Sequence, residues 1–123
     1  AVVPDLDVSV IPGITAMQAL AAASLTPLVE GRESLTLVPV TAGLEAVGAA
    51  LAHADTVVAY KGGRQLADLL AAVRAQGRDG VLGVNLGLPG ETITPLADVD
   101  AETAPYFSTV LVAPRRTETG GRL

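Results

Sequence analysis

The sequence predicts a single α/β domain built on one mixed, roughly five-stranded sheet that helices cover. Its 123 residues suffice for one hydrophobic core and are too few for two. Strand-like and helix-like segments alternate along most of the chain, which is the order found in α/β folds. Several of the links between these segments are short, and this favours a mixed sheet over a purely parallel one.

The chain opens with a predicted strand and a predicted helix. Residues 6–11 alternate apolar and polar side chains and stop at Pro12-Gly13, as a half-buried strand does before a turn. A helix is expected next, because Thr15 and Gln18 have the spacing of a capping box and the segment up to Ala23 is rich in alanine.

A second strand and a weakly encoded helix follow. Residues 34–38 are β-prone, and Thr41 is placed to cap a helix that carries apolar side chains at helical spacing. Gly43 and Gly48 each cost about 1 kcal/mol relative to alanine inside a helix. The stability of this helix must therefore come mainly from packing.

The second half of the chain contributes the clearest helix and three more strands. Leu66, Leu69, Leu70 and Val73 form one apolar stripe, and Gly77 provides a C-terminal stop. The other expected segments are strands at 55–60, 80–85 and 107–112, a short polar segment around 92–94 and a connection over 97–105. The domain is expected to span 1–113, with a flexible, charged tail over 114–123.

Composition argues against several classes of function. A formal net charge of −5 and 2% aromatic residues are unfavourable for nucleic-acid binding, which needs basic surfaces and stacking platforms. With no cysteine and one histidine, His53, the chain has no thiolate chemistry and little basis for a metal site or a Ser/His/Asp triad. Glu30, Glu33, Arg115 and Arg116 are expected to be surface charges.

Nothing in the sequence predicts a membrane or export role. No uninterrupted apolar run approaches the length of a membrane span, about 18 residues. Pro4, Asp5 and Asp7 stand where a signal peptide would have basic and apolar residues. We therefore expect a cytoplasmic protein that contacts neither membrane nor nucleic acid.

Three glycine-bearing loops follow three predicted strands, and open α/β sheets bind ligands at such positions. They are Pro12–Ala16, Lys61–Arg64 and Asn85–Gly90. Free amides at a helix N-terminus can hold an anion, although each loop taken alone is equally explained as a turn or an ordinary helix cap. Neither GxxxxGK(S/T) nor GxGxxG is present, so no standard nucleotide loop is predicted.

Taken together, these segments resemble those of the tetrapyrrole methylases, which methylate corrin and porphyrin precursors. The first of them, residues 10–16, reads VIPGITA; the others are ESLTL at 33–37, DTVVAYKGGR at 55–64, NLGLPGE at 85–91 and PYFST at 105–109. The last two resemble most closely the branch that methylates precorrin-2 at C20. The similarity runs from about Val8 to Pro114.

The resemblance implies an S-adenosylmethionine-dependent C-methyltransferase of cobalamin biosynthesis that converts precorrin-2 to precorrin-3A without a metal. Members of this family hold the methyl donor in a cleft between two α/β halves, and the glycine-rich loop of the N-terminal half is absent from this chain. The chain therefore resembles the C-terminal half, inactive alone, of a homodimeric enzyme. Two alternatives remain open: another methylase of the corrin or sirohaem pathway, and a non-catalytic α/β module that binds an anion or a partner.

The resemblance also assigns site residues where motif positions match. Contacts to the methyl donor fall on Thr15, Ala16, Tyr60, Lys61, Asn85 and Leu86. Lys61 and Arg64 are candidates to bind the carboxylates of the tetrapyrrole. The sequence departs from the family pattern at Val84 and Leu86, and no residue is assigned as the base that removes the acceptor proton.

Overall fold

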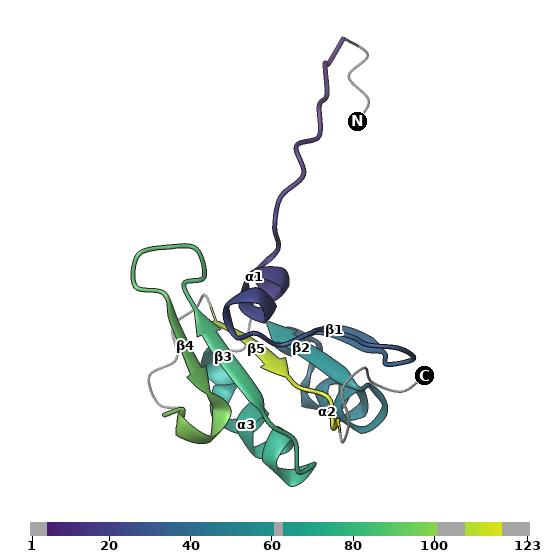
Figure 1. Ribbon diagram of the computed structural model, residues 1–123, viewed down its shortest axis with the longest axis vertical. Helices are drawn as coiled ribbons and strands as arrows, with labels where there is room; N and C mark the ends of the chain where they lie inside the picture. Colours follow the sequence, from purple (N-terminus) through teal and green to yellow (C-terminus); the bar gives the residue numbers. More distant parts are fainter. Residues whose placement is uncertain (1–4, 61–62, 101–107, 117–123) are drawn as a thin grey trace.

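The computed structural model describes residues 5–60, 63–100 and 108–116, and it contains an open five-stranded sheet (Figure 1). The strands are β1 (Leu35–Pro39), β2 (Thr56–Tyr60), β3 (Gly80–Val84), β4 (Thr92–Pro95) and β5 (Ser108–Val112). The helices are α1 (Ala16–Ala23), α2 (Leu44–His53) and α3 (Leu66–Ala75). The predicted fold class, one α/β domain with a mixed five-stranded sheet, is confirmed.

The strand order is β1-β2-β5-β3-β4, so the last strand lies between two earlier ones. β1 and β2 are parallel, whereas β5 is antiparallel to both β2 and β3. As a result β2 and β3 run in the same direction on either side of β5, and their carboxyl ends lie at one edge of the sheet.

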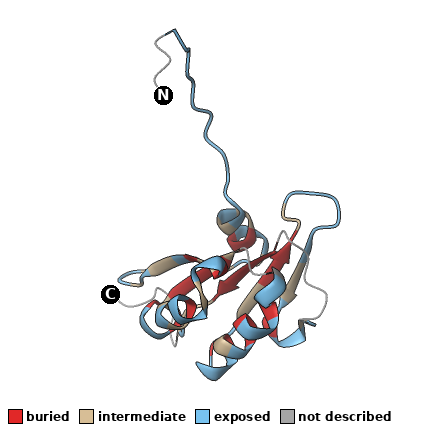
Figure 2. Ribbon diagram, turned by 180° about the vertical axis from the view of Figure 1, so that it is seen from behind, coloured by how far each residue is buried: buried red, intermediate tan, exposed pale blue. Residues whose placement is uncertain are grey.

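The two faces of the sheet are covered unequally. The helices α2 and α3 pack on one face over a large apolar core that includes Val47, Leu51 and Leu70. Among the described helices, the opposite face carries α1 alone, whose Leu20 packs with Val58 and Leu111 in a smaller cluster. Figure 2 shows the buried strands between these layers. The α1 face is therefore the thinly covered one.

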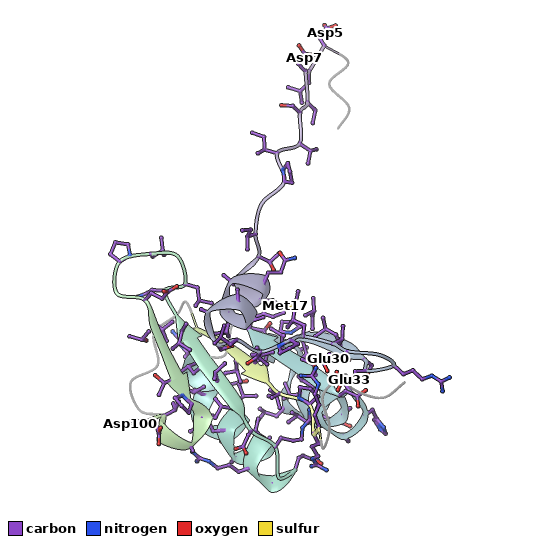
Figure 3. The ribbon with its side chains drawn as sticks, in the orientation of Figure 1. Asp5, Asp7, Met17, Glu30, Glu33 and Asp100 are labelled. Atoms are coloured by element: carbon purple, nitrogen blue, oxygen red, sulfur yellow. The ribbon has the colours of Figure 1, made fainter. Side chains whose placement is uncertain are left out.

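Residues 6–11 do not form the predicted strand. They run out from the body of the molecule as an extended arm (Figure 1), with Asp5 and Asp7 at its far end (Figure 3). The arm exposes four large apolar side chains, namely Leu6, Val8, Val10 and Ile11. A strand needs a neighbour to hydrogen-bond to, and no strand within the described ranges pairs with the arm. The alternation of polar and apolar residues over 6–11 was therefore not enough to predict a strand.

The fifth strand of the sheet is instead β4, which the sequence predicted only as a short polar segment. β4 pairs with β3 alone and lies at an edge, where its Thr92 side chain is exposed and Pro95 is tolerated. The predicted cap of α2 was also wrong. Thr41 lies in a single 3₁₀ turn, and Gly43, with φ 103°, is the N-cap residue without a side-chain hydrogen bond.

Arg78, which precedes β3, connects three elements at the end of the sheet where β2 begins. Its side chain is 7% exposed and donates hydrogen bonds to four backbone carbonyl oxygens. The acceptors are Leu51 at 2.9 Å, Ala54 at 3.2 Å, Ala113 at 3.2 Å and Asp55. Burial is the main effect that lowers the pKa of Arg78, but a guanidinium stays protonated in proteins. One cation thus joins the end of α2 to the start of β2 and the end of β5.

Glu33 and Arg116, expected to be surface charges, form a largely buried ion pair. Their closest atoms are 2.6 Å apart, and the Glu33 side chain is 3% exposed. Arg116 also donates to the carbonyl oxygen of Pro27 at 3.1 Å, and Glu30 lies beside Glu33 (Figure 3). This pair ties residues 114–116, the start of the predicted tail, to the loop before β1. The rest of that tail, 117–123, lies outside the described residues.

We expect Arg78→Met to lower the free energy of unfolding by about 3 kcal/mol, because buried carbonyl groups lose a charged donor. Urea unfolding followed by circular dichroism measures the loss. The matched control is Arg32→Met, at an exposed position, where a change within about 0.5 kcal/mol is expected. Equal effects of the two substitutions would contradict the role given to Arg78.

Glu33 makes the stability of the protein depend on pH in the acid range. The hydrogen bond from Arg116 is the largest effect and lowers the pKa of Glu33 below its ordinary 4.5. A carboxylate with a lowered pKa in the folded state stabilises fully above its unfolded pKa and loses that contribution as pH falls through the folded pKa.

The difference in unfolding free energy between wild type and Glu33→Gln should therefore be constant from about pH 7 to 5 and shrink at lower pH. Urea titrations at a series of pH values measure it. A difference that stays constant, or that grows on acidification, would show that the Glu33 carboxylate does not contribute in this way.

Candidate functional site

Strand pairing places the ends of β2 and β3 next to each other. Tyr60, the last residue of β2, pairs with Thr109 of β5, and Thr109 pairs on its other side with Gly83 of β3. With strands about 4.8 Å apart, the Cα atoms of Tyr60 and Gly83 are separated by roughly 10 Å. The segments that follow β2 and β3 thus leave the sheet at the same edge, where α/β proteins bind ligands.

The end of β2 and the segment after it carry three of the predicted site residues. Tyr60 is half-buried and belongs to the apolar cluster beneath α1. Lys61 lies outside the described residues. Arg64 is exposed in a single 3₁₀ turn, Gly63–Gln65, directly before α3. The structure therefore positions Tyr60 at the α1 face and Arg64 at the beginning of the next helix.

The loop after β3 is shaped by its own hydrogen bonds. The amide of Leu88 donates to the carbonyl of Asn85 at 2.9 Å, and the amide of Gly87 donates to Oε1 of Glu91 at 3.0 Å. Asn85 has φ 51°, a left-handed conformation that asparagine adopts more readily than most residues. This turn lets the Leu86 side chain lie against Gly83, whereas Leu88 is exposed and Asn85 is half-buried.

The third predicted element is the start of α1, where the predicted capping box is confirmed. The amide of Gln18 donates to Oγ1 of Thr15 at 3.2 Å, and the amide of Thr15 donates to Oε1 of Gln18 at 3.1 Å. Thr15 and Ala16 are exposed. By helix geometry, the amides of Ala16 and Met17 have no acceptor inside the helix.

These elements share one face of the sheet. Tyr60, Leu86 and Met17 all pack against the cluster centred on Leu20 of α1. Within the described ranges, the structure therefore brings together α1, the end of β2 and the loop after β3. Sequence reasoning overlooked Gly83 and Thr109, which join these elements. Their role depends on the register of the sheet, for which the sequence carries no local signal.

The start of α1, the end of β2 and the loop after β3 form an open surface and not an enclosed pocket. A shallow apolar depression of about 590 Å³ lies beside α1, but residues 18–29 line it, and none of the predicted contact residues does. In the part of the chain that the structure describes, no three His, Cys, Asp or Glu side chains cluster as metal ligands. No described helix is long and apolar enough to cross a membrane.

We expect Thr15→Ala to destabilise the start of α1 by about 1 kcal/mol, because the capping hydroxyl is lost. Hydrogen exchange should show faster exchange of the Gln18 amide and of the next turn of the helix. Thr41→Ala is the matched control, since Thr41 caps no helix. Unchanged protection of α1 in the Thr15 variant would show that the capping box does not hold this helix end.

Known proteins match the chain along most of its length. A precorrin-2 C(20)-methyltransferase of Sinorhizobium sp is 39% identical over 107 residues, which are 85% of this chain and 44% of that protein. The cobalamin biosynthesis protein CobIJ of Mycobacterium tuberculosis (strain ATCC 25618 / H37Rv) is 34% identical over 105 residues, 84% of this chain and 21% of CobIJ. The chain thus spans less than half the length of these relatives.

Solved structures share the fold. The methyltransferase CobJ superposes with a TM-score of 0.67 at 22% identity, over 96% of this chain and 56% of CobJ. The cobalt precorrin-4 methyltransferase CbiF superposes with a TM-score of 0.65 at 17% identity, over 88% of this chain and 52% of CbiF. Residues 1–100 match the family model of the tetrapyrrole (corrin/porphyrin) methylases. The chain belongs to the tetrapyrrole (corrin/porphyrin) methylase family.

Proposed function

We propose that this chain is the C-terminal half of a cytoplasmic, S-adenosylmethionine-dependent methyltransferase that methylates precorrin-2 at C20 to give precorrin-3A. The observation that carries the proposal is the convergence of three matching segments, the start of α1, Tyr60 and the loop after β3, at one edge of the sheet. The relative that is 39% identical over 85% of the chain, a precorrin-2 C(20)-methyltransferase, supports the choice of substrate.

Two features of the molecule support a second half that completes the site. The arm over residues 6–11 exposes alternating apolar side chains without a strand to pair with among the described residues. The α1 face is thinly covered and leaves Leu37 half exposed. In the proposal, the rest of the polypeptide pairs with the arm, encloses the methyl donor against the α1 face, and assembles as a homodimer.

The residues present fit a methyl donor that carries an adenosine and an amino acid. The amides at the start of α1, which have no acceptor inside the helix, and the backbone of the loop after β3 offer donors for polar groups, and Tyr60 offers a half-buried aromatic ring. We assign Thr15, Ala16, Tyr60, Lys61, Asn85 and Leu86 to this ligand. The carboxylates of the tetrapyrrole are assigned to Lys61 and Arg64, since cations recognise carboxylates strongly.

Methyl transfer from a sulfonium requires the protein mainly to align the methyl donor with the acceptor carbon. When bound, S-adenosylmethionine would supply the methyl group from its sulfonium to C20 and leave as the neutral thioether S-adenosylhomocysteine, and the proton lost from C20 would pass to solvent. The transfer needs no metal and no protein nucleophile. Holding donor and acceptor carbon in line accounts for most of the acceleration in such a displacement. The residues of this chain therefore act by binding and orienting.

A second candidate is a methylase that acts on a different position of a related tetrapyrrole. The similarity to CobIJ, and the fold shared with CobJ and CbiF, favour keeping it. The two candidates differ only in the acceptor. Incubation of the complete gene product with isotopically labelled S-adenosylmethionine and precorrin-2 separates them, because the proposal requires the label at C20.

The isolated chain should bind the methyl donor weakly, because half of the cleft is absent. We expect calorimetry with S-adenosylhomocysteine to give clear binding to the complete gene product and binding weaker than micromolar to residues 1–123. Sub-micromolar affinity of the isolated chain would show that the site lies elsewhere. Absence of binding to the complete gene product would overturn the methyltransferase proposal itself.

A further inference from the structure

Gly83 occupies a notch in the face of the sheet that carries α1. It lies in one row with Tyr60, Thr109 and Ile93 on the neighbouring strands. Because residues paired across a sheet project from the same face, the other three residues of the row place side chains there. Gly83 has no side chain, so the row of side chains has a gap at this position, and this gap is the notch.

Two leucine side chains fill the notch from different elements. A β-carbon at Gly83 would lie 2.8 Å from Cδ1 of Leu20 and 3.0 Å from both δ-carbons of Leu86. Leu20 belongs to α1 and is fully buried, so its side chain can move only against the neighbours that it packs on. Leu86 belongs to the loop after β3. The missing side chain thus allows α1 and this loop to meet on the sheet at one point.

The two elements that meet there both carry proposed contacts to the methyl donor. Thr15 and Ala16 lie one helical turn before Leu20, and Asn85 precedes Leu86. Seating both leucines on Gly83 fixes the start of α1 relative to the backbone of the loop. A methyl at Gly83 would displace the δ-carbons of Leu20 or Leu86 and so alter how α1 or the loop packs on the sheet, since close-packed interiors accommodate an added methyl only by displacement.

We propose that Gly83 is a positioning residue for the methyl donor, acting through Leu20 and Leu86. The inference rests on the proposed function. Gly83 sets the spacing between the start of α1 and the backbone of the loop after β3, the two surfaces that hold the donor. It makes no contact with the tetrapyrrole. A substitution there should therefore weaken donor binding without changing the interaction with the acceptor.

The experiment uses three variants of the complete gene product. Gly83→Ala adds the obstructing methyl. Gly48→Ala is the matched control, because a β-carbon at Gly48 meets nothing within 4 Å. The double variant Gly83→Ala, Leu20→Val removes the δ-carbon that the new methyl meets first. Calorimetry measures the affinity for S-adenosylhomocysteine, and steady-state kinetics measure KM for the donor and for precorrin-2.

For Gly83→Ala we expect roughly tenfold weaker binding of S-adenosylhomocysteine, the effect of overpacking by one methyl. KM for the donor should rise while KM for precorrin-2 stays unchanged, and the double variant should recover most of the affinity. Gly48→Ala should bind like the wild type. The two KM values separate positioning from simple loss of stability, because a partly unfolded enzyme would bind the donor and precorrin-2 less well alike, whereas a displaced donor site affects the donor.

Equal affinity of Gly83→Ala and wild type would overturn the inference and leave the proposed function standing. So would a loss that Leu20→Val does not relieve, or an equal rise in both KM values, since each would indicate general destabilisation. Failure of the wild-type gene product to bind S-adenosylhomocysteine would overturn the proposed function, and the role of Gly83 with it.

Discussion

The arrangement of the candidate site depends on the hydrogen bonding of β5 to β2 on one side and to β3 on the other. β5 is antiparallel to both neighbours, so β2 and β3 run in parallel with one strand between them. The carboxyl ends of β2 and β3 therefore lie at one edge of the sheet, roughly 10 Å apart. Arg78 holds the other end of β5 by bonding to the carbonyl of Ala113 as well as to the segment before β2.

The two faces of the sheet differ in how densely they are packed, and this difference sets where a ligand can bind. The face under α2 and α3 is sealed by the larger core and can serve as a scaffold. The face under α1 holds the smaller cluster, the half-buried Tyr60 and the notch at Gly83. Candidate binding elements lie on the side with less packing, which is where a ligand and a further layer of protein can still be accommodated.

The helices and central strands of this fold could be predicted from sequence because their signals are local. The capping box of Thr15 and Gln18, the leucine stripe of α3 and the positive-φ glycine after α3, Gly77, are all present as expected. The errors have a common origin. The arm over 6–11 has the alternation of a strand without a described partner, and β4 is a strand because β3 pairs with it.

The ion pair of Glu33 and Arg116 illustrates the same limit, since 83 residues separate two charges that each look like surface residues. By itself the sequence determined the α/β class, the positions of the helices and the motifs that match a family. These depend on neighbouring residues along the chain. Only the tertiary structure decided which strands pair, which face stays thinly covered and that Leu20 and Leu86 meet at Gly83, because contacts between distant segments follow from the packing of the whole chain.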